Sequence, residues 1–177
     1  MSAFGLIDSP HGAGMHSARM RAVTRLAALG KPMDIITSFA RREHRRLDAM
    51  LRRVRTEVEA GQMDEARASC DAFHRGLSLH ATIEEQLFFP LFEARSGMVG
   101  GPTATLRHEH RELEAAARSM CEALSRDDRA SFHEGLRLLE EVRPEHESKE
   151  EHVLYPTTDQ MLSDRECAAV VERLERL

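Results

Sequence analysis

The feature that most constrains this chain is an eleven-residue segment that occurs twice, 66 residues apart. The first copy, His80 to Pro90, reads HATIEEQLFFP, and the second, His146 to Pro156, reads HESKEEHVLYP. Each copy begins with His, carries two Glu four and five residues later, and ends with an aromatic residue before Pro. The chain therefore contains the same local design twice.

A second pair of segments repeats at the same distance. Residues 41–48 read RREHRRLD and residues 107–114 read RHEHRELE, so His44 corresponds to His110, again 66 residues later. Chance matches would not share one constant shift, whereas the duplication of a helical hairpin would produce it. The sequence therefore predicts two equivalent halves.

Apolar residues at steps of three and four predict that both halves are helical. The expected long helices run from Asp34 to a break at 59–62, from about 64 to 95, from 103 to about 125, and from a turn at 126–128 to 156. The Gly-rich segment 96–102 divides the halves. We expect an all-α fold, an up-down-up-down four-helix bundle over residues 34–177, flanked by short helices at both ends. Residues 1–33 are expected to be an N-terminal arm with a short helix from Met15 to Leu29.

Four local features refine this expectation. Thr103 is a candidate cap for the third helix, and the segment from Ser163 to Glu166 has the form of a capping box for a C-terminal helix. Pro90 should kink the second helix or limit its last turn, and Pro144 should bend the fourth helix ahead of its motif.

Composition excludes several classes of protein. Charged residues make up 31% of the chain and hydrophobic residues 41%, which favours soluble helices over sheet. No apolar run approaches the roughly 18 residues of a membrane span, and the net charge of −5 argues against nucleic acid as a partner. Three widely spaced cysteines, Cys70, Cys121 and Cys167, indicate reduced thiols and a cytoplasmic location rather than a disulfide framework or a zinc knuckle.

The repeated His and Glu residues are candidate metal ligands. Residues four apart share one helix face, so each HxxxE pair points inward with the apolar stripe. A single inward His is more often a hydrogen-bonded core residue than a ligand, but here the set occupies equivalent positions on four helices. Burying two ionised carboxylates without a cation would cost several kcal/mol. The predicted ligands are His44, His80, Glu84, His110, His146 and Glu150.

The donor types limit the choice of metal. Imidazole and carboxylate without thiolate suit iron, manganese or zinc. Six side chains do not close two coordination spheres, which disfavours a purely structural zinc site. If both glutamates bridge two ions, the surplus positive charge should attract hydroxide, oxide, reduced dioxygen or another small anion.

With its ordered His, HxxxE, His, HxxxE pattern, the chain resembles hemerythrin-like proteins of the HHE cation-binding group over roughly residues 33 to 175. The resemblance implies a four-helix bundle that holds a non-haem di-iron centre of two iron ions with an oxo or hydroxo bridge. In that group Glu84 and Glu150 would be bridging carboxylates, and the four His would be terminal ligands.

The sequence departs from the oxygen-carrying hemerythrins at one position. Their third helix supplies two His four residues apart, whereas here the second is Glu114, whose counterpart in the other half is Asp48. These acids either join the ligands or, as we favour, accept a hydrogen bond from a ligating imidazole. The exchange of nitrogen for carboxylate puts reversible oxygen carriage, as the resemblance would imply it, in doubt.

Three further residues near the motif are expected to have structural roles. Glu85 and Glu151 lie about 100° around the helix from their neighbours Glu84 and Glu150, which favours a solvated or inter-helix salt-bridge role over metal ligation. Tyr155 corresponds to Phe89, so packing is the favoured role for its ring.

Three functions fit this pattern. A binding or sensing protein would take up dioxygen or nitric oxide, and a sensor would need a protein partner, since no signalling or DNA-binding domain is expected. A stress-protective enzyme would disproportionate peroxide. An iron donor for iron-sulfur cluster repair is less favoured because residues 1 to 33 contain no Cys. A stable bundle with adventitious zinc is the remaining alternative, and the residues leave open whether the protein is an enzyme.

Overall fold

The computed structural model describes residues 34–176, so the predicted arm of residues 1–33 and its short helix lie outside the described residues. The described part belongs to two compact units, one of residues 36–161 and one that includes residues 34–35 and 162–176. All candidate site residues belong to the first unit.

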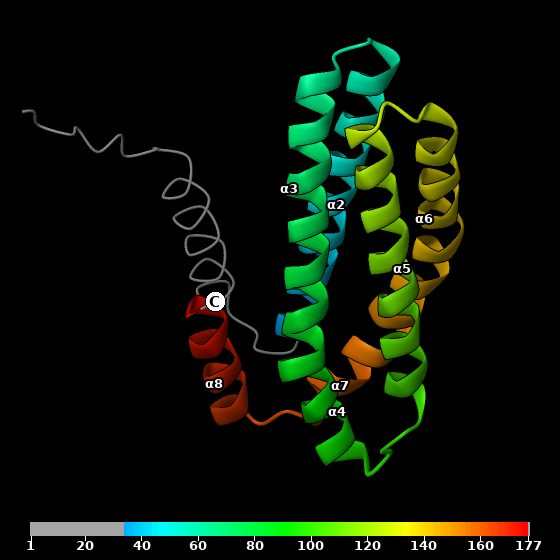
Figure 1. The fold of residues 1–177 in the computed structure, drawn as a ribbon. Helices are drawn as coiled ribbons and strands as arrows, with labels where there is room; N and C mark the ends of the chain where they lie inside the picture. The colour runs from blue at the N-terminus through cyan, green and yellow to red at the C-terminus, as the bar shows by residue number, and fades with distance from the viewer. Residues whose placement is uncertain (1–33, 177) are drawn as a thin grey trace, which may run out of the picture. The chain divides into compact units, whose positions relative to one another are not determined.

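Helices build the first unit, and residues 34–176 contain no strand. The long helices α2, α3, α5 and α6 lie side by side (Figure 1). They span Ile35–Glu59, Met63–Ile83, Pro102–Ser125 and Arg129–Lys149. Two π-helical turns, η2 (Glu84–Phe88) and η3 (Glu150–Leu154), extend α3 and α6 into the short helices α4 (Phe89–Ser96) and α7 (Tyr155–Met161). The second unit contains α8 (Asp164–Glu175). The all-α prediction is confirmed.

Each copy of the repeated motif contains a π-helical turn that begins at its first glutamate. The backbone N–H of Phe89 bonds to the carbonyl of Glu84, and that of Tyr155 bonds to the carbonyl of Glu150, each five residues earlier. Such turns widen an α-helix locally and are frequent at functional sites. The periodicity of the sequence predicted ordinary helix here.

The prolines of the motif do not end their helices. Pro90 and Pro156 lie in the first turns of α4 and α7. The N–H groups of a first turn have no acceptor within the helix, so a proline there removes no hydrogen bond of α4 or α7. The helices continue to Ser96 and Met161, so the predicted end of the fourth helix at residue 156 is five residues short. Pro144 lies inside α6, which continues past it as helix.

Asp159 of α7 holds the start of α2. Its two carboxylate oxygens each accept a bond of 3.0 Å from a backbone N–H, one from Ile36 and one from Thr37, and the Thr37 hydroxyl donates at 2.7 Å. These N–H groups belong to the first turn of a helix and have no acceptor within it. A buried carboxylate from the last helix of the unit, more than 120 residues later in the sequence, therefore caps α2.

Two other helix starts test the predicted caps. The capping box of α8 is confirmed, since Glu166 accepts from the backbone N–H of Ser163 at 2.9 Å. The predicted cap of α5 by Thr103 is wrong. That helix begins at Pro102, whose fixed φ suits a first turn, and the Thr103 hydroxyl instead donates to Glu93 at 2.5 Å.

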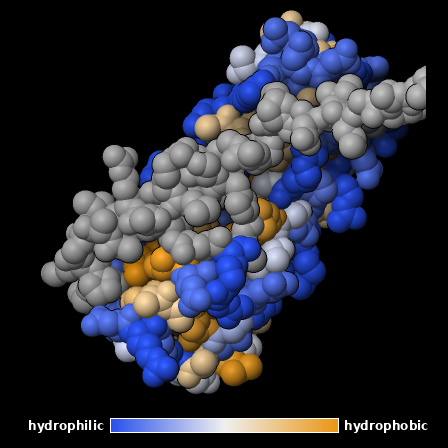
Figure 2. Space-filling model, turned by 90° about the vertical axis from the view of Figure 1, so that its left-hand side faces the viewer, coloured by the Kyte–Doolittle hydropathy of each residue, from blue (hydrophilic) through white to orange (hydrophobic). Residues whose placement is uncertain are grey.

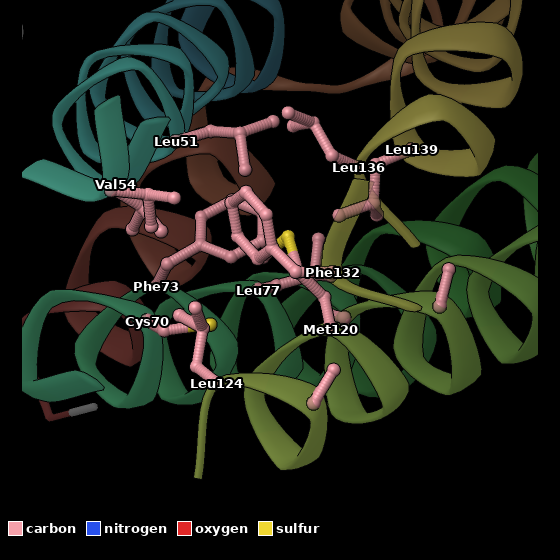
Figure 3. Close-up of a cluster of buried hydrophobic side chains, with 14 of the residues drawn as sticks. Leu51, Val54, Cys70, Phe73, Leu77, Met120, Leu124, Phe132, Leu136 and Leu139 are labelled. Atoms are coloured by element: carbon pink, nitrogen blue, oxygen red, sulfur yellow. The ribbon is translucent and has the colours of Figure 1, made fainter. Parts of the chain in front are cut away.

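A hydrophobic core joins the four long helices. Val54 of α2, Phe73 of α3, Met120 of α5 and Phe132 of α6 are fully buried and point toward one another (Figure 3). Full burial of such a side chain contributes about 1.5–3 kcal/mol. Because the same helices continue from the core to the motif residues, core packing sets the spacing of the candidate site.

Gly135 permits a close approach of α6 to α5. A Cβ at this position would lie 2.9 Å from the Met120 Cβ and 3.2 Å from the Ala116 carbonyl oxygen. We expect Gly135→Ala to lower the free energy of unfolding by about 1–3 kcal/mol through overpacking, although alanine is the better helix former. Urea unfolding measures the change.

Gly76→Ala is the matched control. The atoms nearest to its Cβ would be two guanidinium nitrogens of Arg46 and a methyl carbon of Leu47, each at 3.3 Å. These are movable ends of side chains, so the control should stay within about 1 kcal/mol of the wild type. Equal stability of Gly135→Ala and the wild type would contradict the close approach.

Cys70 of α3 and Cys121 of α5 form a disulfide that links residues 51 apart in sequence. The prediction of reduced thiols is therefore wrong for this pair. Sequence spacing does not show which cysteines meet in space, and α3 packs against α5 along the length that contains both. The disulfide also removes the observation on which the predicted cytoplasmic location depended.

Among the helices of residues 34–176, none has both the length and the apolar character that a membrane span requires. One face of the molecule presents mostly hydrophilic residues, with hydrophobic residues in smaller groups (Figure 2).

Candidate metal centre

The six residues predicted as metal ligands meet inside the first unit. His44 comes from α2, His80 from α3, Glu84 from η2, His110 from α5, His146 from α6 and Glu150 from η3. Each is at most 3% exposed. The structure therefore brings together, out of contact with water, residues that lie up to 106 positions apart in the sequence, from 44 to 150.

These side chains form two groups that share both glutamates. One group contains His44 and His80 with Glu84 and Glu150, and the other contains His110 and His146 with the same two carboxylates. Within each group, one ligand atom per residue lies within 4.8 Å of the others. The arrangement offers two neighbouring positions for a cation.

Each glutamate turns one oxygen toward each group. For Glu84, Oε1 lies 3.1 Å from His80 Nε2 and Oε2 lies 3.1 Å from His110 Nε2. Glu150 repeats this arrangement, with Oε2 3.3 Å from His44 Nε2 and Oε1 3.3 Å from His146 Nε2. A carboxylate placed in this way can bridge two ions.

The unbonded atoms of the site fit a pair of cations. Both oxygens of Glu84, Oε2 of Glu150 and Nε2 of His110 are buried without a hydrogen-bond partner. Nε2 of His44 faces Nε2 of His80 at 3.2 Å. Buried carboxylates without partners cost several kcal/mol. Divalent cations at the two positions would remove this cost, and the donors are of the kind that iron, manganese and zinc accept.

Proximity of the carboxylates shifts the pKa of the site's groups. Burial and the charge of Glu84 raise the pKa of Glu150. Burial acts to lower the pKa of His44, but its close contact with the Glu150 carboxylate, 3.3 Å from Nε2 to Oε2, and the charge of Glu84 raise that pKa to about 9. Burial likewise opposes the shift of His110, but its interactions with Glu84 and Glu150 raise its pKa to about 9. Without metal, these two rings therefore carry protons at neutral pH.

Metal binding should therefore release protons. A metal binds the neutral imidazole, and the raised pKa values of His44 and His110 mean that protons must leave below pH about 9. Apparent affinity should rise about tenfold per pH unit for each displaced proton, and level off above that pKa. Calorimetric titration in buffers of different ionisation enthalpy counts the protons. Affinity independent of pH between 7 and 9 would contradict the raised values of about 9.

Carboxylates on neighbouring helices hold the other nitrogen of three imidazoles. The contacts are His44 Nδ1 with Glu151 at 2.7 Å, His110 Nδ1 with Glu85 at 2.9 Å, and His146 Nδ1 with Glu109 at 3.0 Å. An acceptor at Nδ1 keeps the proton there and leaves the Nε2 lone pair for a metal.

Glu85 and Glu151 lie off the inward face and belong to neither candidate group, and Glu151 forms an ion pair with Arg41 of α2 at 3.3 Å, as the predicted inter-helix salt-bridge role required. The sequence analysis did not predict that both carboxylates also contact an imidazole of an adjacent helix. The signal was their constant place after the inward glutamate in both copies of the motif. The sequence pattern indicated no role for Glu109, which directly precedes His110.

Asp48 and Glu114, expected to orient imidazoles, belong to neither candidate group. Asp48 accepts from Arg143 at 2.8 Å, and its side chain is 41% exposed. With Arg143 it lines a groove of about 380 Å³ beside α2 and α6, to which none of the six candidate ligands contributes. The Nδ1 atoms point sideways to neighbouring helices, so a residue one turn further along the same helix does not reach them.

Tyr155 does more than pack. Its ring lies edge-on to Phe88 with centroids 5.6 Å apart, and its hydroxyl donates to Glu150 Oε1 at 3.2 Å. Burial and the negative charges of Glu150 and Glu84 raise its pKa well above the usual value, so the phenol keeps its proton. Its counterpart Phe89 stacks on His110. The phenylalanine at the equivalent position concealed this polar contact from the sequence analysis.

A family model described as Hemerythrin HHE cation binding domain matches residues 36–158. The match covers more than half of the chain and includes both copies of the motif and all six candidate ligands. No curated protein and no solved structure matches the chain.

Proposed function

Because the chain belongs to the hemerythrin HHE cation-binding family, we propose that it holds two iron ions and that this di-iron centre binds or reacts with dioxygen, nitric oxide or peroxide. One observation supports the proposal above all others: two buried carboxylates each face both pairs of imidazoles and lack hydrogen-bond donors on three of their four oxygens.

Each side chain has a defined part in this proposal. His44 and His80 would hold one ion, His110 and His146 the other, and Glu84 and Glu150 would span both. Bound iron would supply the redox chemistry and open positions for a small ligand. Burial of all six side chains keeps bulk water away from the centre.

Peroxide disproportionation is the second candidate, and Tyr155 favours it. Decomposition of peroxide moves protons between oxygen atoms, and the Tyr155 hydroxyl is a protonated group in contact with Glu150. A site with phenylalanine at this position, as in the other half of the chain, would have no such group. The chain would then be a stress-protective enzyme rather than a binding protein.

Other parts of the prediction stay predictions. The up-down-up-down order of the long helices is supported by the short connections between them. A cytoplasmic location, a protein partner for a sensor and an iron-donor role in iron-sulfur cluster repair have no described contact that favours them.

The test begins with metal-free protein loaded anaerobically with ferrous iron. Elemental analysis should give two iron ions per chain. Dioxygen, nitric oxide and peroxide are then added separately while the absorption spectrum is followed. A reversible band with dioxygen or nitric oxide supports binding, and rapid gas evolution from peroxide supports the enzyme. Zinc-loaded protein is the control. An unchanged iron spectrum with all three reagents would overturn the proposal.

A further inference from the structure

The duplication predicts equal support for the imidazoles of both metal positions. Glu109 and Glu43 are counterparts 66 residues apart, as are His146 and His80. If the halves were equivalent, Glu43 would hold Nδ1 of His80 in the way that Glu109 holds Nδ1 of His146.

The structure breaks this equivalence. Glu109 lies 3.0 Å from His146 Nδ1 through Oε2, while its Oε1 accepts from Lys149 at 2.5 Å. Nδ1 of His80, by contrast, is buried and has no hydrogen-bond partner. Its expected partner Glu43 accepts a hydrogen bond of 3.0 Å from Nε of Arg46, and the same carboxylate oxygen lies 2.9 Å from Nη2 of Arg46 as an ion pair.

Two differences between the halves explain the asymmetry. The counterpart of Arg46 is Glu112, so the second half has no guanidinium to draw Glu109 away from the imidazole. The counterpart of Lys149 is Ile83, so the first half has no ammonium group on the helix of His80 to hold Glu43 toward it.

An imidazole without a partner at Nδ1 is a weaker ligand. A carboxylate acceptor fixes the tautomer and ring orientation and raises the basicity of the ligating nitrogen, and its removal typically costs 10–100-fold in metal affinity. One position therefore has two oriented imidazoles, His110 and His146, whereas the other has only one, His44.

We propose that the two metal positions are unequal, that the His110 and His146 position fills first with a roughly 10–100-fold higher affinity, and that Glu109 is the positioning residue responsible. The inference rests on the proposed two-ion centre. It assigns different roles to the ions: one resident, and one more readily exchanged.

Titration of the metal-free protein with Mn²⁺, followed by electron paramagnetic resonance, tests the inference. One equivalent should give the hyperfine-split spectrum of an isolated ion, and the second should convert it to that of a coupled pair. Glu109→Ala should weaken the first step about 10–100-fold, so that the two steps merge. Glu109→Gln, which keeps an oxygen acceptor, should restore part of the separation.

Glu43→Ala is the matched control, at the equivalent position of the first half. It should leave both steps unchanged, because the Glu43 carboxylate is bonded to Arg46 rather than to His80. Circular dichroism melts of the metal-free variants show that each is folded. Uptake of both ions in one step, or equal weakening by Glu43→Ala and Glu109→Ala, would overturn the inequality and leave the two-ion centre intact. A wild-type protein that binds no ion would overturn both.

Discussion

Replacement of Glu84 by glutamine is expected to empty both metal positions. Glu84 offers one oxygen to each group, so a single substitution removes a charged ligand from both ions. Loss of an indirect partner already costs 10–100-fold in affinity, and loss of this shared ligand should cost more than about a hundredfold. Metal content after desalting should fall from two ions per chain to near zero.

Thermal unfolding provides a second measure of the same variant. Metal at about a hundred times its dissociation constant stabilises a folded protein by about 2.7 kcal/mol per site. The wild type should therefore unfold at a higher temperature with metal, and Glu84→Gln should not respond. Glu112→Gln, on an exposed face of α5, is the control and should behave as the wild type. Full retention of two ions by Glu84→Gln would show that this carboxylate bridges nothing.

Reduction of the Cys70–Cys121 disulfide is expected to lower the free energy of unfolding by about 4 kcal/mol. The bond closes a loop with a sequence separation of 51 residues. Closing a loop of this size reduces the conformational entropy of the unfolded chain, which raises the free energy of the unfolded state by about 4 kcal/mol. Guanidinium unfolding with and without dithiothreitol measures the loss. Metal content should change little, because the cysteines lie about ten residues, roughly 15 Å of helix, from the ligands on α3 and α5.

The Cys70→Ala/Cys121→Ala double variant is the control for this measurement. It should be as unstable as the reduced wild type and should not respond to dithiothreitol. Titration of thiols in denaturant should count one per chain before reduction and three after it, since two of the three cysteines are joined. A count of three before reduction would rule out the disulfide.

Features that repeat along the chain were predictable from sequence. The constant shift and the apolar stripe predicted the long helices and the inward positions of His44, His80, His110 and His146. These signals are periodic, and helical periodicity fixes the direction of a side chain.

Features that depend on which helices are neighbours were not predictable. Glu151 orients His44 from 107 residues away, and Asp159 caps α2 from 123 residues away. Prediction of Cys121 as the disulfide partner of Cys70 would have required knowledge that α3 packs against α5. The π-helical turns at Glu84 and Glu150 could not be predicted from the spacing of apolar residues, because each turn changes the helical register by only one residue.

The glutamates of each half of the chain contact a histidine of the other half. Glu84 and Glu85 of the first half reach His110 of the second, and Glu150 and Glu151 of the second half reach His44 of the first. Reciprocal contacts of this kind are those of an isologous interface in a twofold-symmetric dimer. One hairpin alone carries half of the candidate ligands, so a chain of a single hairpin could complete such a centre only by self-association.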